Sequence, residues 1–105
     1  MIEILEKEIY QVAAKYFPTQ LATLIKALEA HMPGDLIVEL PQPFEGSPKA
    51  LEELHEYQQN KNRLVVWVLP QSGVAELPTE WACVPTLQEA LDYIQFEQMQ
   101  RDLGF

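Results

Sequence analysis

The chain is poor in cysteine and in long apolar runs. Cys83 is its only cysteine, so no disulfide can form within the chain, and we expect a reducing compartment. The longest apolar run, Leu64 to Leu69, has six residues, whereas a membrane-spanning helix needs roughly 20. The start, Met1 to Glu8, is too acidic and too interrupted for a signal peptide. We therefore expect a cytoplasmic protein that does not cross a membrane.

Basic residues are also scarce. Seven lysines and arginines stand against 16 acids, and the formal net charge is −9. A surface of this sign repels phosphate backbones, so we expect no nucleic-acid partner, and it disfavours anionic membranes as well. The charge serves solubility in one interpretation. In the other, it indicates a protein partner with a basic face.

Motifs of catalysis and metal binding are missing. The chain has no glycine-rich phosphate cradle, no Walker motif and no triad spacing. His31 and His55 have no histidine or cysteine at metal-ligand spacing. Cys83 has no base beside it, so we interpret it as an apolar filler rather than a reactive thiol. We therefore expect no catalytic residues, no metal and no cofactor.

The apolar content that the chain does have suits one domain over residues 1–105, because 48% of the residues are hydrophobic. The runs DLIVEL, Asp35 to Leu40, and RLVVWVL, Arg63 to Leu69, predict buried strands. A short strand is predicted from Trp81 to Val84. We expect Trp67 in the core and Trp81 at its edge.

Helical patterns alternate with these strands. One helix is predicted from residue 19 to 28, and a second from Ser47-Pro48 to Tyr57, with Ser47 as N-cap and Pro48 as first helical residue. Thr86 and Glu89 form a capping box before a last helix that reaches about Leu103. The predicted inner face of that last helix comprises Leu87, Ala90, Leu91, Ile94 and Met99.

The first 15 residues fit two structures. The apolar spacing favours a helix slightly, and a hairpin turning near residues 6–8 is the alternative. From residue 19 onward, the alternation of helices and strands predicts an α/β fold. We expect a small mixed, partly parallel sheet of about four to five strands with three helices.

In this order of elements the chain resembles the STAS domain, the small fold of bacterial anti-sigma-factor antagonists. The N-terminal segment has hairpin length, and DLIVEL leads through the loop Phe44 to Ser47 into a helix and then into RLVVWVL. The ending VPTLQEALDYI, Val84 to Ile94, resembles the last strand and helix of the family. Residues 95–105 resemble the C-terminal extensions of some Bacteroidetes members. The resemblance covers the whole chain and implies that residues 1–15 form two strands.

The chain departs from the family at the regulatory loop, which reads approximately Asp-Ser-Ser-Gly-Leu in the family. Counted from Phe44, Gly46 takes the place of the aspartate and Ser47 that of the first serine. Pro48 stands where the usual phosphate-accepting serine would be, and Lys49 replaces the glycine. The acceptor is therefore absent or shifted by one residue. Ser47 alone could be a phosphosite, and its other interpretation is a helix N-cap.

The resemblance implies that the helix after this loop contacts a partner. The predicted partner-binding residues are Glu45, Ser47, Lys49, Glu52, Glu53 and Glu56. The three glutamates of the helix are otherwise a solvated face. Our first hypothesis is a non-catalytic regulatory domain that binds an anti-sigma factor or a serine kinase without the usual phosphoserine switch.

Two other hypotheses stay open. The second is a constitutive scaffold or interaction subunit that uses the acidic helix face and the tail Gln98 to Phe105. Formation of homo-oligomers also stays open. The third is a small-ligand-binding protein or an enzyme.

Overall fold

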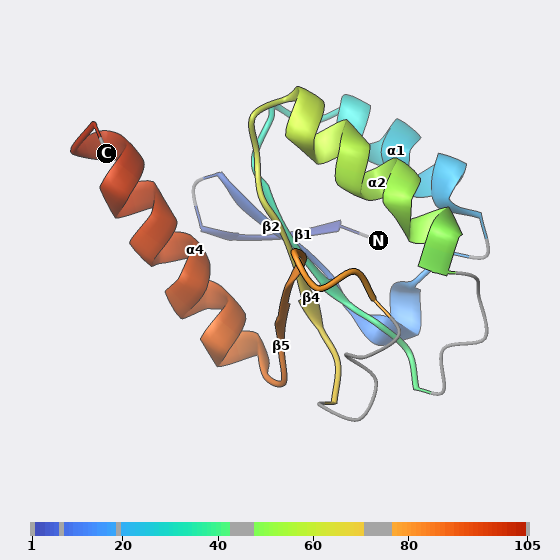
Figure 1. The fold of residues 1–105 in the computed structure, drawn as a ribbon. Coiled ribbons are helices and arrows are strands. Elements are labelled where there is room, and N and C mark those ends of the chain that lie inside the picture. The colour runs from blue at the N-terminus through green and yellow to red at the C-terminus, as the bar shows by residue number, and fades with distance from the viewer. Residues whose placement is uncertain (1, 7, 19, 43–47, 71–76, 105) are drawn as a thin grey trace.

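A five-stranded sheet forms the centre of the molecule. In this computed structural model, residues 2–6, 8–18, 20–42, 48–70 and 77–104 are described. The strands lie in the order of the chain: β1 (Ile2–Glu6), β2 (Ile9–Val12), β3 (Asp35–Glu39), β4 (Val65–Val68) and β5 (Ala82–Val84). A 3-10 turn, η1 (Ala14–Tyr16), follows β2. Helices α1 (Leu21–Glu29) and α2 (Pro48–Asn60) lie on one side of the sheet and α4 (Leu87–Asp102) lies on the other (Figure 1).

The sheet is mixed, which confirms the predicted fold class. Strands β1 and β2 are antiparallel, whereas β2, β3, β4 and β5 are mutually parallel neighbours. The pattern that slightly favoured a helix over the first 15 residues is wrong, because residues 2–6 and 9–12 form the two strands of a hairpin. Glu8 turns the chain with a positive φ of 66°, and a register shift between Ile4 and Glu6 interrupts the alternation that marks a strand in sequence.

Each face of the sheet has its own apolar cluster, as the alternation of side chains along a strand requires. The face toward α1 and α2 carries Tyr10, Val12, Leu36, Val38, Val65 and Trp67, which pack on Leu24, Leu28, Leu51 and Leu54. The opposite face carries Ile9, Ile37, Val66 and Val68, which pack on Ala90 and Ile94 of α4. The central strands β3 and β4 contribute to both clusters, so Leu36 to Val38 and Val65 to Val68 are apolar without interruption.

Buried Gln58 fixes the C-terminal half of α2 to the sheet. Its Nε2 donates to the carbonyl oxygens of Gly34 and Leu64, both at 2.8 Å, just before β3 and β4 begin. The helix ends two residues later, and Asn62 follows with a φ of 57°. Asparagine tolerates this left-handed conformation better than most residues.

Helix α4 begins as predicted. At its C-terminal end, however, it turns a different face toward the sheet from the one predicted. The Oγ1 of Thr86 accepts a hydrogen bond from the backbone N–H of Glu89 at 3.2 Å, which confirms the cap. Gly104 has a φ of 79° directly after the helix. Met99 is exposed rather than packed on the sheet, so that part of the predicted inner face is wrong. Gln98 and Arg101 turn toward the sheet instead.

Gln98 and Arg101 turn inward because they bind the fully buried carboxylate of Asp35. Its Oδ2 accepts from Nη2 of Arg101 at 2.7 Å and from Nε2 of Gln98 at 3.0 Å. Its Oδ1 accepts from the backbone N–H of Leu64 at 2.9 Å. A buried charge is costly unless it is paired and hydrogen-bonded. The position of α4 is therefore tied to the beginning of β3 and to the residue before β4.

We expect the substitution Arg101→Ala to lower the free energy of unfolding by about 1.5–3 kcal/mol, because a buried carboxylate then loses a charged donor. Urea unfolding followed by tryptophan fluorescence measures this change, since Trp67 and Trp81 are both buried. The matched control is Asp102→Ala, at the exposed neighbouring position, which should change stability by less than about 0.5 kcal/mol. An equal loss in both variants would contradict the assigned role of Arg101.

Candidate functional site

The predicted site lies along α2, and its residues divide into two groups. Glu45 and Ser47 lie outside the described residues, so their predicted roles stay predictions. Lys49, Glu52, Glu53 and Glu56 are all exposed, as expected. Residues three and four apart lie on one side of a helix, so these four side chains share one face of α2. That face points away from the buried Leu51 and Leu54.

The tertiary structure adds a second wall to this face. A groove of about 220 Å³ lies between Glu52, His55, Glu56 and Gln59 of α2 and the segment that holds Pro78, Glu80 and Trp81. Sequence reasoning missed Glu80, because nothing in its local pattern indicates that it faces α2. Three carboxylates thus surround one imidazole, and the groove favours cationic groups.

Three aromatic rings are stacked beneath this groove. The ring of His55 lies 4.7 Å from that of Trp81, with an angle of 11° between their planes. The ring of Trp81 lies 5.2 Å from that of Trp67, with an angle of 15°. Trp67 is fully buried and Trp81 is only 8% exposed. Both tryptophans therefore belong to the core, as predicted, and they hold His55 in a fixed orientation.

The surroundings of His55 favour its neutral form. Burial lowers the pKa of His55 below its ordinary value of 6.5, while the charges of Glu80 and Glu56 partly oppose this shift. At neutral pH the groove therefore has acidic walls and an uncharged aromatic floor. Burial also raises the pKa of the Cys83 thiol, which agrees with the prediction that this cysteine is not a reactive thiolate.

A second groove, of about 280 Å³, continues along the same side of the molecule. It shares His55, Gln59 and Glu80 with the first groove and extends to Arg63 of the α2–β4 turn and Tyr93 of α4. Strand β5, at the edge of the sheet, contributes Ala82 to its wall. The two grooves together form a channel-like depression between α2 and the β5 edge, which we call the α2–β5 groove.

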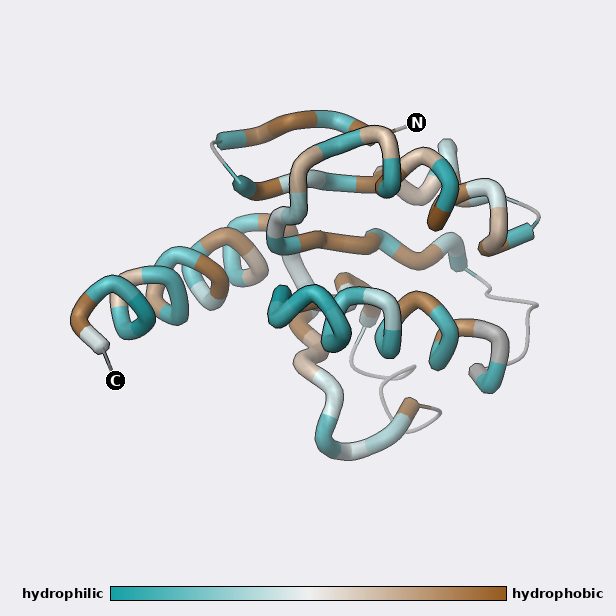
Figure 2. The backbone as a smooth tube through the Cα atoms, turned by 90° about the horizontal axis from the view of Figure 1, so that it is seen from above, coloured by the Kyte–Doolittle hydropathy of each residue, from teal (hydrophilic) through white to brown (hydrophobic). Residues whose placement is uncertain are grey.

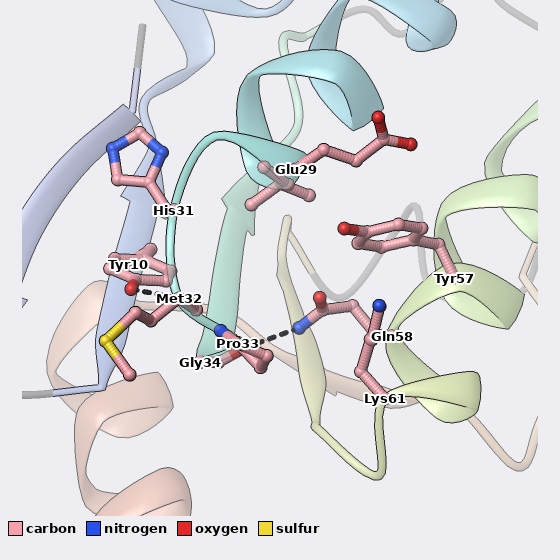
Figure 3. Close-up of a pocket in the computed structure, with 10 residues that line it drawn as sticks. Tyr10, Glu29, His31, Met32, Pro33, Gly34, Tyr57, Gln58 and Lys61 are labelled. Carbon is pink, nitrogen blue, oxygen red and sulfur yellow. Dashed lines mark hydrogen bonds between the residues drawn. The ribbon is translucent and has the colours of Figure 1, made fainter.

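A third cavity, of about 220 Å³, lies on another side of the C-terminal half of α2, beside the turn that joins α1 to β3 (Figure 3). The hydroxyl of Tyr10 donates to the carbonyl oxygen of Met32 at 2.6 Å. Gly34 is required there because a Cβ would lie 2.6 Å from the Tyr10 ring. Burial and the charge of Glu29 raise the pKa of Tyr57. The contacts of Tyr10, and those of Gln58 in the same wall, hold the fold together, so we assign no ligand to this cavity.

In the described ranges, no group of three or more histidine, cysteine, aspartate or glutamate side chains could hold a metal ion. No helix among the described residues has the length and apolarity of a membrane span.

The fold and this site define an α/β domain with an acidic, aromatic-floored groove beside an edge strand. Comparison with known proteins finds no matching family model, no matching curated protein and no matching solved structure. A function can therefore be inferred only from the residues of this chain.

We expect the stability of the protein to depend on the protonation of His55. The folded state binds this proton less readily than the unfolded chain, because the pKa of His55 is lowered on folding. The contribution of the neutral ring is fully present above pH 6.5 and is lost as the pH falls through the lower pKa of the folded state. Unfolding free energies of the wild type and of His55→Gln, measured between about pH 8 and about pH 5, check this.

The wild type should lose stability more steeply with acidification than His55→Gln, whatever the difference between the two at high pH. All carboxylates and His31 are common to both proteins, so the difference in slope isolates His55. Parallel curves over the whole range would refute the expectation.

Proposed function

We propose that this chain is a non-catalytic regulatory domain that binds another protein, similar to an anti-sigma-factor antagonist but without the phosphoserine switch of that family. Its partner in this proposal is an anti-sigma factor or a serine kinase. The binding surface is the exposed face of α2 with Lys49, Glu52, Glu53 and Glu56, together with Glu45 and Ser47 of the preceding segment.

The observation that carries the proposal is the position of α2 relative to β3. Strand β3 lies between β2 and β4, and the helix that follows it begins at Pro48. Carboxyl ends of strands in open, largely parallel sheets are where such folds commonly bind their partners and ligands. The N-terminal hairpin also agrees with the two strands that the resemblance implies for the start of the chain.

The charge of α2 supports a protein partner over a nucleic acid. Its exposed side carries three glutamates, and Glu80 adds a fourth carboxylate across the groove. Complementary charge accelerates association and selects against partners of the same sign. Lysine and arginine side chains on the partner are the natural counterparts of this surface.

The absence of the switch follows from the residue at the start of α2. Proline has no hydroxyl, so position 48 cannot accept a phosphoryl group. A phosphate on Ser47 would gain from a helix N-terminus, but the nearby Glu45 carries a charge that opposes it. We therefore expect no stoichiometric phosphorylation when the protein is incubated with ATP and a serine kinase of the anti-sigma class. Intact-protein mass spectrometry measures the result.

A positive control for this experiment is the variant Pro48→Ser, which restores a hydroxyl at the position of the usual acceptor. The added mass should appear on this variant and not on the wild type. Phosphate found stoichiometrically on Ser47 of the wild type, and lost in Ser47→Ala, would sink the proposal that the switch is missing.

The partner-binding part of the proposal predicts a charge effect. The double substitution Glu53→Lys/Glu56→Lys should weaken binding to a co-purifying anti-sigma factor or serine kinase about tenfold. Two exposed ion pairs together contribute about 1.4 kcal/mol, which corresponds to that factor. Isothermal titration calorimetry at low and high salt measures the affinity and its dependence on ionic strength.

The matched control is Glu3→Lys/Asp102→Lys, which makes the same change in net charge at exposed positions of β1 and α4. Its affinity should stay close to that of the wild type. If both double variants lose the same affinity, binding responds to net charge and the α2 face is not the docking surface.

A further inference from the structure

Helix α4 has an apolar face that nothing in the described structure covers. Tyr93, Phe96, Met99 and Leu103 are 39%, 56%, 58% and 65% exposed. Their spacing of three, three and four residues places them on one side of the helix, and we call this side the α4 ridge. Figure 2 shows hydrophobic positions recurring along α4 out to its last turn, on a helix set apart from α1 and α2.

The α4 ridge is not a displaced part of the core. The opposite side of the helix already fills the space over the sheet through Ala90 and Ile94, which are fully buried. Hydrogen bonds from Gln98 and Arg101 to Asp35 fix the rotation of the helix, and Gln95 Nε2 donates to Glu6 Oε1 at 2.9 Å. A rotation that buried the ridge would remove Arg101 and Gln98 from the Asp35 carboxylate and leave it only one ion pair, the longer contact with Arg63 at 3.9 Å. The ridge is therefore held outward in a rigid, preorganised form.

The charges beside the ridge are of one sign. Glu89 and Asp92 lie one turn before Tyr93 and Phe96, and Glu97 lies one turn after Tyr93. The only basic residue of α4 is Arg101, and its charge is directed to Asp35 at 2.7 Å. An apolar strip bordered by carboxylates is complementary to an apolar strip bordered by lysine or arginine.

We propose that the α4 ridge is a second docking surface, which binds an amphipathic helix of a partner protein whose apolar face is bordered by lysine and arginine. The ridge spans eleven residues from Tyr93 to Leu103, which are about 15 Å apart along the helix axis. A partner helix of about three turns would therefore cover it. Aromatic and methionine side chains are residue types that commonly anchor such contacts with a partner helix. The inference does not depend on the proposed function of α2.

The charge argument selects this occupant over two others. A second copy of the chain would bring the same carboxylates against the ridge, since α4 has no uncommitted cation to answer them. An anionic membrane surface would meet a chain of net charge −9 and be repelled. Sedimentation and vesicle binding distinguish these two occupants from a partner helix.

The probe is a labelled helical peptide of leucine and lysine, with leucine on one face, titrated with the full chain and followed by fluorescence anisotropy. We expect the wild type to bind it and Phe96→Gln/Met99→Gln to bind at least about tenfold more weakly, because central apolar anchors dominate such contacts. Glutamine keeps the helix propensity and the net charge of the chain unchanged. Leu103→Gln, in the last turn, is a second variant that should weaken binding in the same direction.

The matched control is Ile4→Gln/Met32→Gln, which removes two other exposed apolar side chains, 64% and 81% exposed, that lie outside α4. It should bind the peptide like the wild type. Equal binding by the wild type and the ridge variant would overturn the proposal, because the contact would then be one of net charge alone. Equal binding of a leucine and glutamate peptide would overturn the assigned charge of the partner.

Two further measurements decide between occupants. A wild-type dimer in sedimentation that dissociates in the ridge variant would identify a second copy as the occupant and overturn the proposal. Ridge-dependent binding to vesicles containing phosphatidylserine would do the same in favour of a membrane surface. A monomer that ignores such vesicles but binds the leucine and lysine peptide through the ridge supports it.

Discussion

The buried carboxylate of Asp35 is the constraint on which the arrangement of the two helical layers depends. It begins β3, accepts from the residue before β4 and is paired with Arg101 near the end of α4. A buried ion pair does not by itself make a protein more stable than an apolar packing would. Here the ion pair excludes other placements of α4 on the sheet, because few of them would bring both a cation and an amide to the buried Asp35. Gln58 has the corresponding role for α2 on the other face of the sheet.

The contacts of Asp35 and Gln58 lie at the same end of the sheet, where β3 and β4 begin. The hydrogen bonds that hold the helices in place are therefore concentrated away from the end of the sheet at which β3 ends and α2 begins. That division leaves the beginning of α2 and its glutamates without a structural duty of this kind. The aromatic stack of Trp67, Trp81 and His55 keeps the groove rigid without using any of its carboxylates.

The two proposed surfaces lie on opposite layers of the sheet and have different chemistry. The α2 face is acidic and suits charged side chains, whereas the α4 ridge is apolar with acidic borders. Helix α4 is fixed by Asp35 and not by α2, and Tyr93 is the residue of the α4 ridge that also lines the α2–β5 groove. Both surfaces follow from the same property of the chain. Acidic residues outnumber basic ones, and some of the few basic residues are already paired within the fold.

Local patterns predicted the parts of this fold that depend on near neighbours. The strand around Ile37, the strand around Val66 and the cap at Thr86 could be identified because alternation, burial and capping act over a few residues. The hairpin was harder, because the turn at Glu8 and the irregular register of β1 disturb the pattern that would reveal it. The exposed glutamates of α2 were identified correctly from helical spacing, but the opposing Glu80 was not, since its position depends on how the chain returns after β4.

The sequence by itself determined the α/β class, the positions of the buried strands and the acidic character of the surface. Periodicity and composition are local or additive properties, and they need no knowledge of contacts between distant residues. Only the tertiary structure decided which side of the C-terminal half of α4 faces the sheet. That choice depends on one pairing between residues 66 positions apart, Asp35 and Arg101. Once this pairing turns Gln98 and Arg101 inward, Met99 and Phe96 have to face outward, and an apolar pattern that resembled core becomes a surface.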